Sequence, residues 1–196
     1  MMRYSTVIIF FSLYFILLTT SSVYAQDTTK KMIIKDNSKV NNLKNSNPAT
    51  YYLAEGKKKG LNEDYQGAIN DFTTAIFFDS TNADTYFNRG LCNYYLKNYT
   101  DALTDISKAI LHDSLQESYY DQRGICYTLQ SNYPAAKKDF EKALKLKPNS
   151  PDANLNMGVM YLSTGNYDVA CEYLHKAKKF GSDKAQKAID VYCRGK

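Results

Sequence analysis

The sequence predicts an all-α repeat protein, and three observations lead to that prediction. A glycine recurs every 34 residues from position 56 onward, further columns of small or aromatic residues keep the same spacing, and polar turns separate stretches with a helical apolar period. Hydrophobic residues make up 44% and charged residues 23% of the 196, a balance typical of a folded globular protein. The excess of 25 Lys and Arg over 20 Asp and Glu is too small to indicate a dedicated nucleic-acid binder.

Residues 1–25 have the pattern of a secretory signal peptide. Arg3 precedes an apolar stretch at residues 7–18, and the small residue Ala25 closes the segment. The stretch is shorter than the roughly 20 residues that a helix needs to span a bilayer. We therefore expect cleavage between Ala25 and Gln26, no membrane insertion afterwards, and a periplasmic or secreted location. The alternative is an uncleaved membrane anchor.

Residues 26–48 are predicted to form a flexible linker. They are rich in Asn, Lys, Ser and Thr, they hold five Lys against two Asp, and they have no apolar period of helical length. Residues 32–34, Met-Ile-Ile, are an exception, because a fully solvated tether does not need an apolar cluster. The linker is therefore also a candidate to fold back onto the rest of the chain.

Similar residues recur every 34 positions along the chain and define a repeating unit. The columns are glycine at Gly56, Gly90, Gly124 and Gly158; tyrosine at Tyr65, Tyr99, Tyr133 and Tyr167; alanine at Ala68, Ala102, Ala136 and Ala170 and again at Ala75, Ala109, Ala143 and Ala177; and a large apolar residue at Phe72, Ile106, Phe140 and Leu174. Each unit contains a helical period, a polar turn, and a second helical period just after the tyrosine. One such helix pair cannot bury its apolar stripe alone, so the pairs are expected to stack.

This pattern resembles the tetratricopeptide repeat, a 34-residue pair of antiparallel helices with Gly and Ala where the two helices touch most closely. The resemblance covers four units, at residues 49–82, 83–116, 117–150 and 151–184. It implies a right-handed α-solenoid, closed by a C-terminal capping helix within residues 182–196. Only Pro148 matches the proline that the family usually has between units.

The four cysteines are expected to behave in two ways in an exported chain. Cys171 and Cys193 lie eleven residues on either side of position 182, where the last repeat helix turns into the closing helix, so they are predicted to form a disulfide. Their surroundings also resemble the ends of small secreted bacterial proteins of this family. Cys92 and Cys126 share a column, and equivalent sites on adjacent helices lie roughly 8–10 Å apart, too far for a disulfide. They are predicted to be buried thiols.

Arginine and aspartate also recur at fixed places. Arg89 and Arg123 precede the glycine, where the family usually has Leu, and aspartates lie in the second helices at Asp71, Asp105 and Asp139. A partly buried arginine needs a carboxylate partner to offset its desolvation. The spacing does not decide whether Arg89 pairs with Asp71 or with Asp105.

No residue pattern indicates an enzyme. The two histidines, His112 and His175, lie in different units without Cys or carboxylates at metal-ligand spacing. The sequence has no nucleophile elbow, zinc-protease motif, dinucleotide-binding motif or phosphate loop. We therefore expect a non-enzymatic protein with no cofactor, no metal and no small-molecule substrate.

The resemblance implies that function lies on the concave face, where first helices of the family bind peptide segments. The places that the family uses hold Leu53 and Lys57 in the first unit; Phe87, Asn88, Leu91, Tyr94 and Tyr95 in the second; Asp121, Gln122, Ile125 and Leu129 in the third; and Leu155, Asn156 and Val159 in the fourth. Most are apolar, which predicts a groove for an apolar or aromatic peptide or a partner helix, with Phe87 and Tyr95 as anchors.

One subgroup of the family holds a C-terminal carboxylate with cationic side chains on this face. Here Leu53, Ser118 and Gln122 stand where three of those cations would be. The sequence therefore does not predict that chaperone-tail function.

Two functions follow as expectations. The first is an exported non-enzymatic adaptor that holds a segment of another envelope or secreted protein in its concave groove. The second is a structural or accessory subunit of an envelope assembly, bound through its outer faces, with the groove filled by its own linker. Residues 49–121 hold six basic and eleven acidic side chains, whereas residues 122–196 hold thirteen and seven, a division that would orient a partner.

Overall fold

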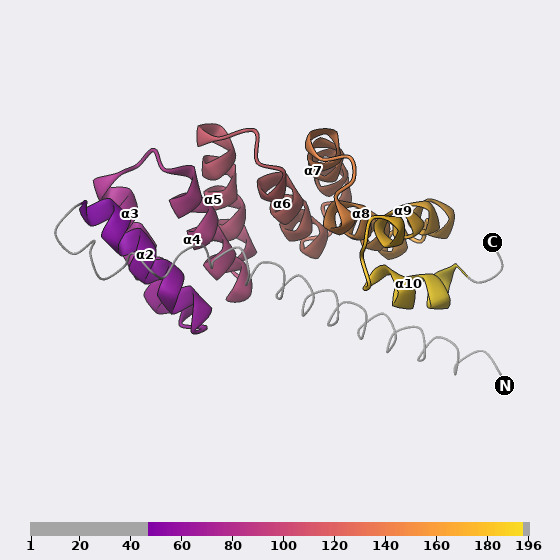
Figure 1. The fold of residues 1–196 in the computed structure, drawn as a ribbon, viewed down its shortest axis with the longest axis horizontal. Coiled ribbons are helices and arrows are strands. Elements are labelled where there is room, and N and C mark those ends of the chain that lie inside the picture. Colours follow the sequence, from indigo (N-terminus) through magenta and orange to yellow (C-terminus); the bar gives the residue numbers. More distant parts are fainter. Residues whose placement is uncertain (1–46, 194–196) are drawn as a thin grey trace.

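The structure, a computed structural model, describes residues 47–193, which form helices joined by short turns. Figure 1 shows antiparallel helix pairs following one another in an open stack. The pairs are α2 (Pro48–Leu61) with α3 (Tyr65–Phe78), α4 (Ala83–Tyr95) with α5 (Tyr99–His112), α6 (Glu117–Leu129) with α7 (Tyr133–Leu146), and α8 (Pro151–Ser163) with α9 (Tyr167–Lys179). The last helix, α10 (Ala185–Tyr192), follows the fourth pair. The predicted all-α solenoid with a closing helix is confirmed.

Two predictions fall outside this region. The signal peptide at residues 1–25 and nearly all of the linker at residues 26–48 lie outside the described residues. Within residues 47–193, no helix is both long enough and apolar enough to span a membrane.

Short polar side chains determine where most of the helices begin. Asn47, Asp64, Asn82, Asn132, Ser150 and Asn166 each accept a hydrogen bond from a backbone N–H in the first helical turn. The second helices begin at the column tyrosine itself, one residue earlier than expected, because the residue before it is the N-cap. The turn inside each pair contains one residue with positive φ, and only the fourth pair has a glycine there, Gly165.

The repeat columns form the core of each pair. The column alanines and the large apolar residues Phe72, Ile106, Phe140 and Leu174 are all buried. The glycine column faces these large residues: a Cβ on Gly124 would lie only 2.6 Å from Cε1 of Phe140. The recurring Gly and Ala therefore allow the two helices of a pair to approach closely.

Contacts between pairs place the first helices on the inner side of the stack. Each second helix packs against the first helix of the next pair, as α3 does against α4. Successive first helices also contact one another, α2 with α4 and α6 with α8, whereas successive second helices contact each other only weakly at most. The surface of α2, α4, α6 and α8 that faces away from the second helices is the first-helix face.

The arginines join neighbouring pairs as well as the helices within a pair. Arg89 donates from Nε and Nη2 to the two carboxylate oxygens of Asp105, at 2.9 and 2.7 Å, and from Nη1 to Thr73 Oγ1 of the preceding pair at 3.1 Å. Arg123 repeats this arrangement with Asp139 and Ser107. The partner of Arg89 is thus Asp105 of its own unit, and Asp71 instead pairs with Lys59, at 2.7 Å.

The closing helix is held against the fourth pair at two places. Ala185, Ala188 and Ile189 of α10 pack against Leu174 of α9. Cys171 and Cys193 are joined by a disulfide, the pairing that the sequence analysis expected, with 5.7 Å between their Cα atoms. The described thiols at Cys92 and Cys126 are free and buried, and burial raises the pKa of each to about 12. Both therefore remain protonated at physiological pH.

Candidate functional site

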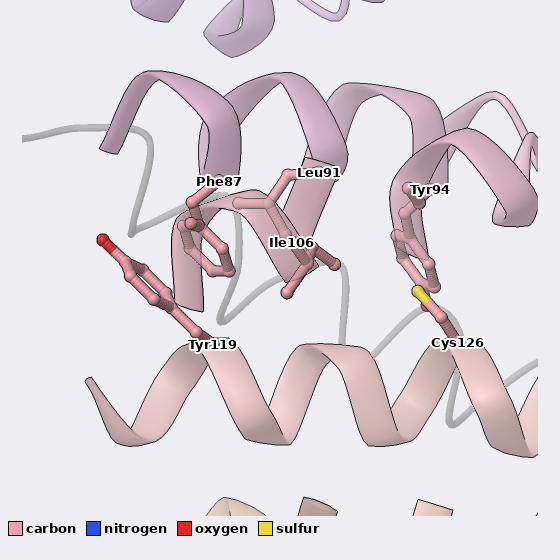
Figure 2. Packing of buried hydrophobic residues seen from close by; sticks show 8 residues of the cluster. Phe87, Leu91, Tyr94, Ile106, Tyr119 and Cys126 are labelled. Atoms are coloured by element: carbon pink, nitrogen blue, oxygen red, sulfur yellow. The ribbon is translucent and has the colours of Figure 1, made fainter. Parts of the chain in front are cut away.

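The first-helix face is the candidate site, but the structure removes five of the fourteen expected residues from it. Phe87, Asn88, Leu91, Tyr94 and Gln122 are buried. Figure 2 shows Phe87 and Tyr94 of α4 pointing toward α6, where they meet Tyr119 and Cys126. The rings of Phe87 and Tyr119 are 4.5 Å apart between centroids. The expectation that Phe87 anchors a partner is therefore corrected: at 5% exposure it is a core residue.

The physical reason for this correction is the crowding of α4. A first helix within the stack contacts its own second helix, the second helix of the preceding pair and neighbouring first helices, so most of its circumference is covered. Leu91 is completely buried, packed in one cluster with Ile106 of α5. An apolar residue at a place that the family uses for binding thus serves here as core.

The remaining expected residues keep partial exposure on the first-helix face. They are Leu53 and Lys57 of α2, Tyr95 of α4, Asp121, Ile125 and Leu129 of α6, and Leu155, Asn156 and Val159 of α8. Tyr95 is held in place by stacking on Tyr65, with ring centroids 4.8 Å apart. Four of these residues are aliphatic and lie on the adjacent helices α6 and α8, so they form the larger accessible apolar part of the face.

Carboxylates on the same helices belong to the site as well, and of these only Asp121 stands at a place that the resemblance assigns to binding. Glu117 and Asp121 are one turn apart on α6, and Asp152 lies in the first turn of α8. We call these three residues the acidic group. Asn156 Nδ2 donates to both carboxylate oxygens of Asp121 at 3.0 Å, and Ser150 Oγ donates to Glu117 at 2.6 Å. These bonds tie α8 to α6.

The environment of Asp121 alters its acidity. Burial raises the pKa of Asp121 to about 8, with smaller contributions in the same direction from Glu117 and Asp152, while the hydrogen bond from Asn156 acts in the opposite direction. A large fraction of Asp121 is therefore neutral at neutral pH. The spacing of Glu117 and Asp121 on one side of a helix was the sequence signal that could have indicated this group.

A similar link joins α4 and α6. Tyr119 donates its hydroxyl hydrogen to Asp84 Oδ1 at 2.9 Å, and burial raises the pKa of Tyr119 above its usual value. Polar bonds thus connect successive first helices along the face.

The chemistry available on this face is that of binding. Among residues 47–193, no three His, Cys, Asp or Glu side chains are arranged to hold a metal ion. Glu117 and Asp121 accept hydrogen bonds, and the aliphatic residues of α6 and α8 provide apolar area beside them. Such a surface can hold an extended segment or a helix through apolar contacts, with the carboxylates selecting its charge.

The outer surface of the second half has the opposite charge. Exposed lysines line α7 at Lys137, Lys138 and Lys145 and α9 at Lys176, Lys178 and Lys179. Two lysines also lie over aromatic rings: Lys142 Nζ is 5.6 Å from the centroid of Tyr120, and Lys176 Nζ is 4.8 Å from that of Tyr173. The acidic group therefore lies on first helices, whereas these lysines lie on second helices.

The stacked pairs with an inner first-helix face define an α-solenoid of helix-pair repeats, and comparisons with known proteins identify the repeat. Two family models described as Tetratricopeptide repeat match residues 122–150 and 140–172. A search of curated protein sequences found no match.

Solved structures with the same fold include several proteins of this family. YrrB, described as a TPR protein with an unusual peptide-binding site, is 25% identical with a TM-score of 0.67, and the match covers 87% of each chain. MamA is 25% identical with a TM-score of 0.66, covering 74% of this chain and 85% of MamA. The second TPR domain of human RPAP3, in complex with the HSP70 peptide SGPTIEEVD, is 27% identical with a TM-score of 0.56, covering 58% of this chain and 94% of that domain.

The chain belongs to the tetratricopeptide repeat family. Its characteristic Gly, Ala and aromatic columns occur in all four pairs, including the two that the family models do not reach.

Proposed function

We propose that the chain is an exported, non-enzymatic adaptor that binds a segment of another protein on its first-helix face. The observation that carries this proposal is the set of partly exposed aliphatic residues on α6 and α8, Ile125, Leu129, Leu155 and Val159, beside the acidic group. Exposed apolar area is costly unless a partner covers it at some stage. Peptide binding by relatives such as YrrB and RPAP3 supports this use of the fold.

The charge of the face favours one class of partner. The RPAP3 domain is bound to a peptide that carries three carboxylate side chains. In this chain, such a peptide would meet the carboxylates of Glu117 and Asp152, and Leu53, Ser118 and Gln122 offer no compensating cation. The proposed partner segment therefore has apolar residues flanked by Lys or Arg, because opposite charge lowers the desolvation penalty of both sides.

A peptide selection against the purified mature chain tests this proposal. Selected peptides should be apolar with flanking Lys or Arg, and Ile125→Lys or Val159→Lys should weaken their binding by about 1–3 kcal/mol, since each places a charge in the apolar part of the face. Thr104→Lys is the matched control, because it adds the same residue at an exposed position of α5. Selection of acidic peptides, or equal losses in the control, would contradict the proposal.

Export is a separate part of the proposal, supported by the signal pattern of residues 1–25. Intact-mass analysis of the chain recovered from the producing cell should find Gln26 as the first residue. A chain that retains Met1 and sediments with membranes would identify residues 1–25 as an anchor instead.

The second candidate function is an accessory subunit of an envelope assembly, bound through its outer face. The exposed lysines of α7 and α9 favour it, because they offer a basic surface for an acidic partner. Replacing Lys138, Lys145 and Lys179 with glutamate would abolish assembly under this alternative and leave peptide binding on the first-helix face unchanged. Loss of peptide binding in that variant would speak against separate surfaces.

A further inference from the structure

Four large apolar side chains are exposed at one edge of the first two helix pairs. Phe77 and Leu111 are 83% and 73% exposed near the ends of α3 and α5; Phe78 is 51% exposed beside Phe77; and Leu115 is 74% exposed in the turn after α5. We call these four residues the apolar edge. Single exposed apolar residues are common on protein surfaces, but a group of them indicates a surface that something covers.

The members of the apolar edge belong to one surface. The rings of Phe77 and Phe78 are 5.3 Å apart. Arg89 donates hydrogen bonds both to Thr73 of α3 and to Asp105 of α5, so these two helices lie next to each other. Hydrogen bonds from Thr81 lower the pKa of Asp79 at the end of α3, and the charge of His112 at the end of α5 acts in the same direction. The two helix ends therefore present their apolar side chains together.

The repeat itself does not require these residues to be apolar. At intervals of 34 residues, the positions of Phe77 and Leu111 are occupied by Lys145 in the third pair and Lys179 in the fourth, and both lysines are exposed. The same helix-end position thus accepts a fully solvated charge. The apolar edge is a property of the N-terminal half of the stack.

The apolar edge lies beside the point where the N-terminal segment joins the described structure. Phe78 stacks on Tyr52 in the second turn of α2, with ring centroids 6.3 Å apart. Because α2 begins at Pro48, the chain that precedes it starts next to this edge. Residues 1–46 lie outside the described structure, and after signal cleavage residues 26–46 would remain attached at this place.

We propose that residues 30–35, Lys-Lys-Met-Ile-Ile-Lys, dock on the apolar edge of their own chain. Thirteen residues separate Ile34 from Asn47, and an extended chain of that length reaches up to about 43 Å at roughly 3.3 Å per residue. Neighbouring helices lie about 8–10 Å apart, so this reach exceeds the distance across both pairs. The tether is long enough, and its attachment point is close enough, to favour an intramolecular contact over an intermolecular one.

Charge also matches this segment to the edge. The apolar triplet is flanked by Lys31 and Lys35, and residues 26–46 hold five Lys against two Asp. Asp79 and Asp113 follow the two helix ends, and hydrogen bonds from Thr81, and from Leu115 and Gln116, lower the pKa of each carboxyl group, so both stay ionised. A segment with apolar residues between lysines therefore complements apolar residues between aspartates. This contact is separate from the first-helix face.

The chain contains no tryptophan, which makes a tryptophan at the apolar edge a clean reporter. Phe77→Trp in the chain retaining residues 26–196 should emit at short wavelength and resist acrylamide quenching, because the docked segment shields it. Adding Ile33→Asp and Ile34→Asp should shift the emission to long wavelength and restore quenching. Asn41→Asp with Asn42→Asp is the matched control, because it adds the same charge to the N-terminal chain outside residues 30–35. This variant should leave the emission unchanged.

Three outcomes would overturn the proposal. An emission typical of a solvated indole in the unmodified segment would show that nothing covers the edge. Shielding that disappears on dilution would assign the cover to a second copy of the chain. An equal shift of the emission wavelength in the control would mean that added charge alone changes the emission of the tryptophan. Leu111→Trp provides a second reporter on the other pair, and an unchanged helical circular dichroism spectrum excludes loss of fold.

Discussion

Gly124 shows at the scale of one residue why the repeat needs a glycine at this place. Its missing side chain leaves room for the ring of Phe140, which is almost fully buried and has little space to move. Gly56 makes the same approach to Phe72 in the first pair. The column is therefore a packing requirement between two helices and not a turn or a hinge.

Gly124→Val should lower the free energy of unfolding by about 1–3 kcal/mol, because it overpacks the contact with Phe140. Phe140→Leu in the same chain removes the ring, so the double variant should lose less than the sum of the two single variants. Urea unfolding measures each value. Thr104→Val, at an exposed helical position, is the control, and an equal loss there would contradict the packing explanation.

Asp121 makes stability depend on pH in a defined direction. Its pKa is raised to about 8 in the folded chain, against an ordinary value of about 3.9 when unfolded. The unfolded chain therefore loses this proton first as pH rises, and folding stability falls between about pH 4 and about pH 8. Asp121→Asn should remove that part of the decline, as measured by urea unfolding across this pH range. Asp101→Asn, at an exposed site on α5, should keep it; identical curves for wild type and Asp121→Asn would refute the assignment.

Two different side-chain sets occupy equivalent places in the second, third and fourth helix pairs. The second and third pairs use an arginine and an aspartate, Arg123 with Asp139 in the third. The fourth pair has Met157 and Tyr173 at these places, and Tyr173 stacks on Tyr161 with ring centroids 5.8 Å apart. Tyr127 of the third pair is the counterpart of Tyr161. At these two places, the ion pair of the third pair is thus replaced by methionine and tyrosine in the fourth.

Arg123→Met alone should destabilise the chain by about 3–5 kcal/mol, because Asp139 is left buried without its counter-ion. Adding Asp139→Tyr reproduces the set found in the fourth pair and should restore most of that loss. Thermal or urea unfolding of the two variants measures the difference. If the double variant is no more stable than Arg123→Met, the Met–Tyr set of the fourth pair cannot replace the Arg–Asp set of the third. The packing around α7 would then determine which side chains are tolerated.

The whole molecule depends on its neighbour-to-neighbour contacts, so its ends are its weakest parts. At the C-terminal end, α10 has eight residues and covers the last pair with only a short apolar surface. The disulfide between Cys171 and Cys193 closes this hairpin over a sequence separation of 22 residues. It therefore compensates for the small contact area of the closing helix.

Cys171→Ser with Cys193→Ser should reduce the local stability of the α9–α10 hairpin by about 3 kcal/mol, because the open form regains the chain entropy of the loop. Hydrogen exchange should show faster exchange in α10 than in α5 of the same variant. Peptide mapping of the unreduced protein should find this one bridge, with Cys92 and Cys126 free. Four reactive thiols in protein taken from an oxidising compartment would refute the disulfide between Cys171 and Cys193.

The fold of this protein could be predicted from its amino-acid sequence. The 34-residue columns recur four times, and each column reports a local requirement: glycine or alanine where two helices meet, tyrosine at the start of the second helix, and a large apolar residue facing the glycine. The polar turns predicted where one helix of a pair ends and the next begins, apart from a shift of one residue at the start of the second helices. Such requirements act between residues close in the chain, so their spacing is enough to predict them.

The accessibility of individual first-helix residues could not be predicted in the same way, because it depends on how the helix pairs pack against one another. The sequence gives Phe87, Leu91 and Tyr94 the same periodicity as Ile125 and Val159, yet the first three are core and the last two are partly exposed. It also could not choose Asp105 for Arg89 or place Asn156 against Asp121. Each of these outcomes depends on how far one pair is rotated and shifted against the next. That displacement arises from contacts between pairs, such as the one between Asn156 and Asp121 at a sequence separation of 35 residues, which the period of a single helix does not encode.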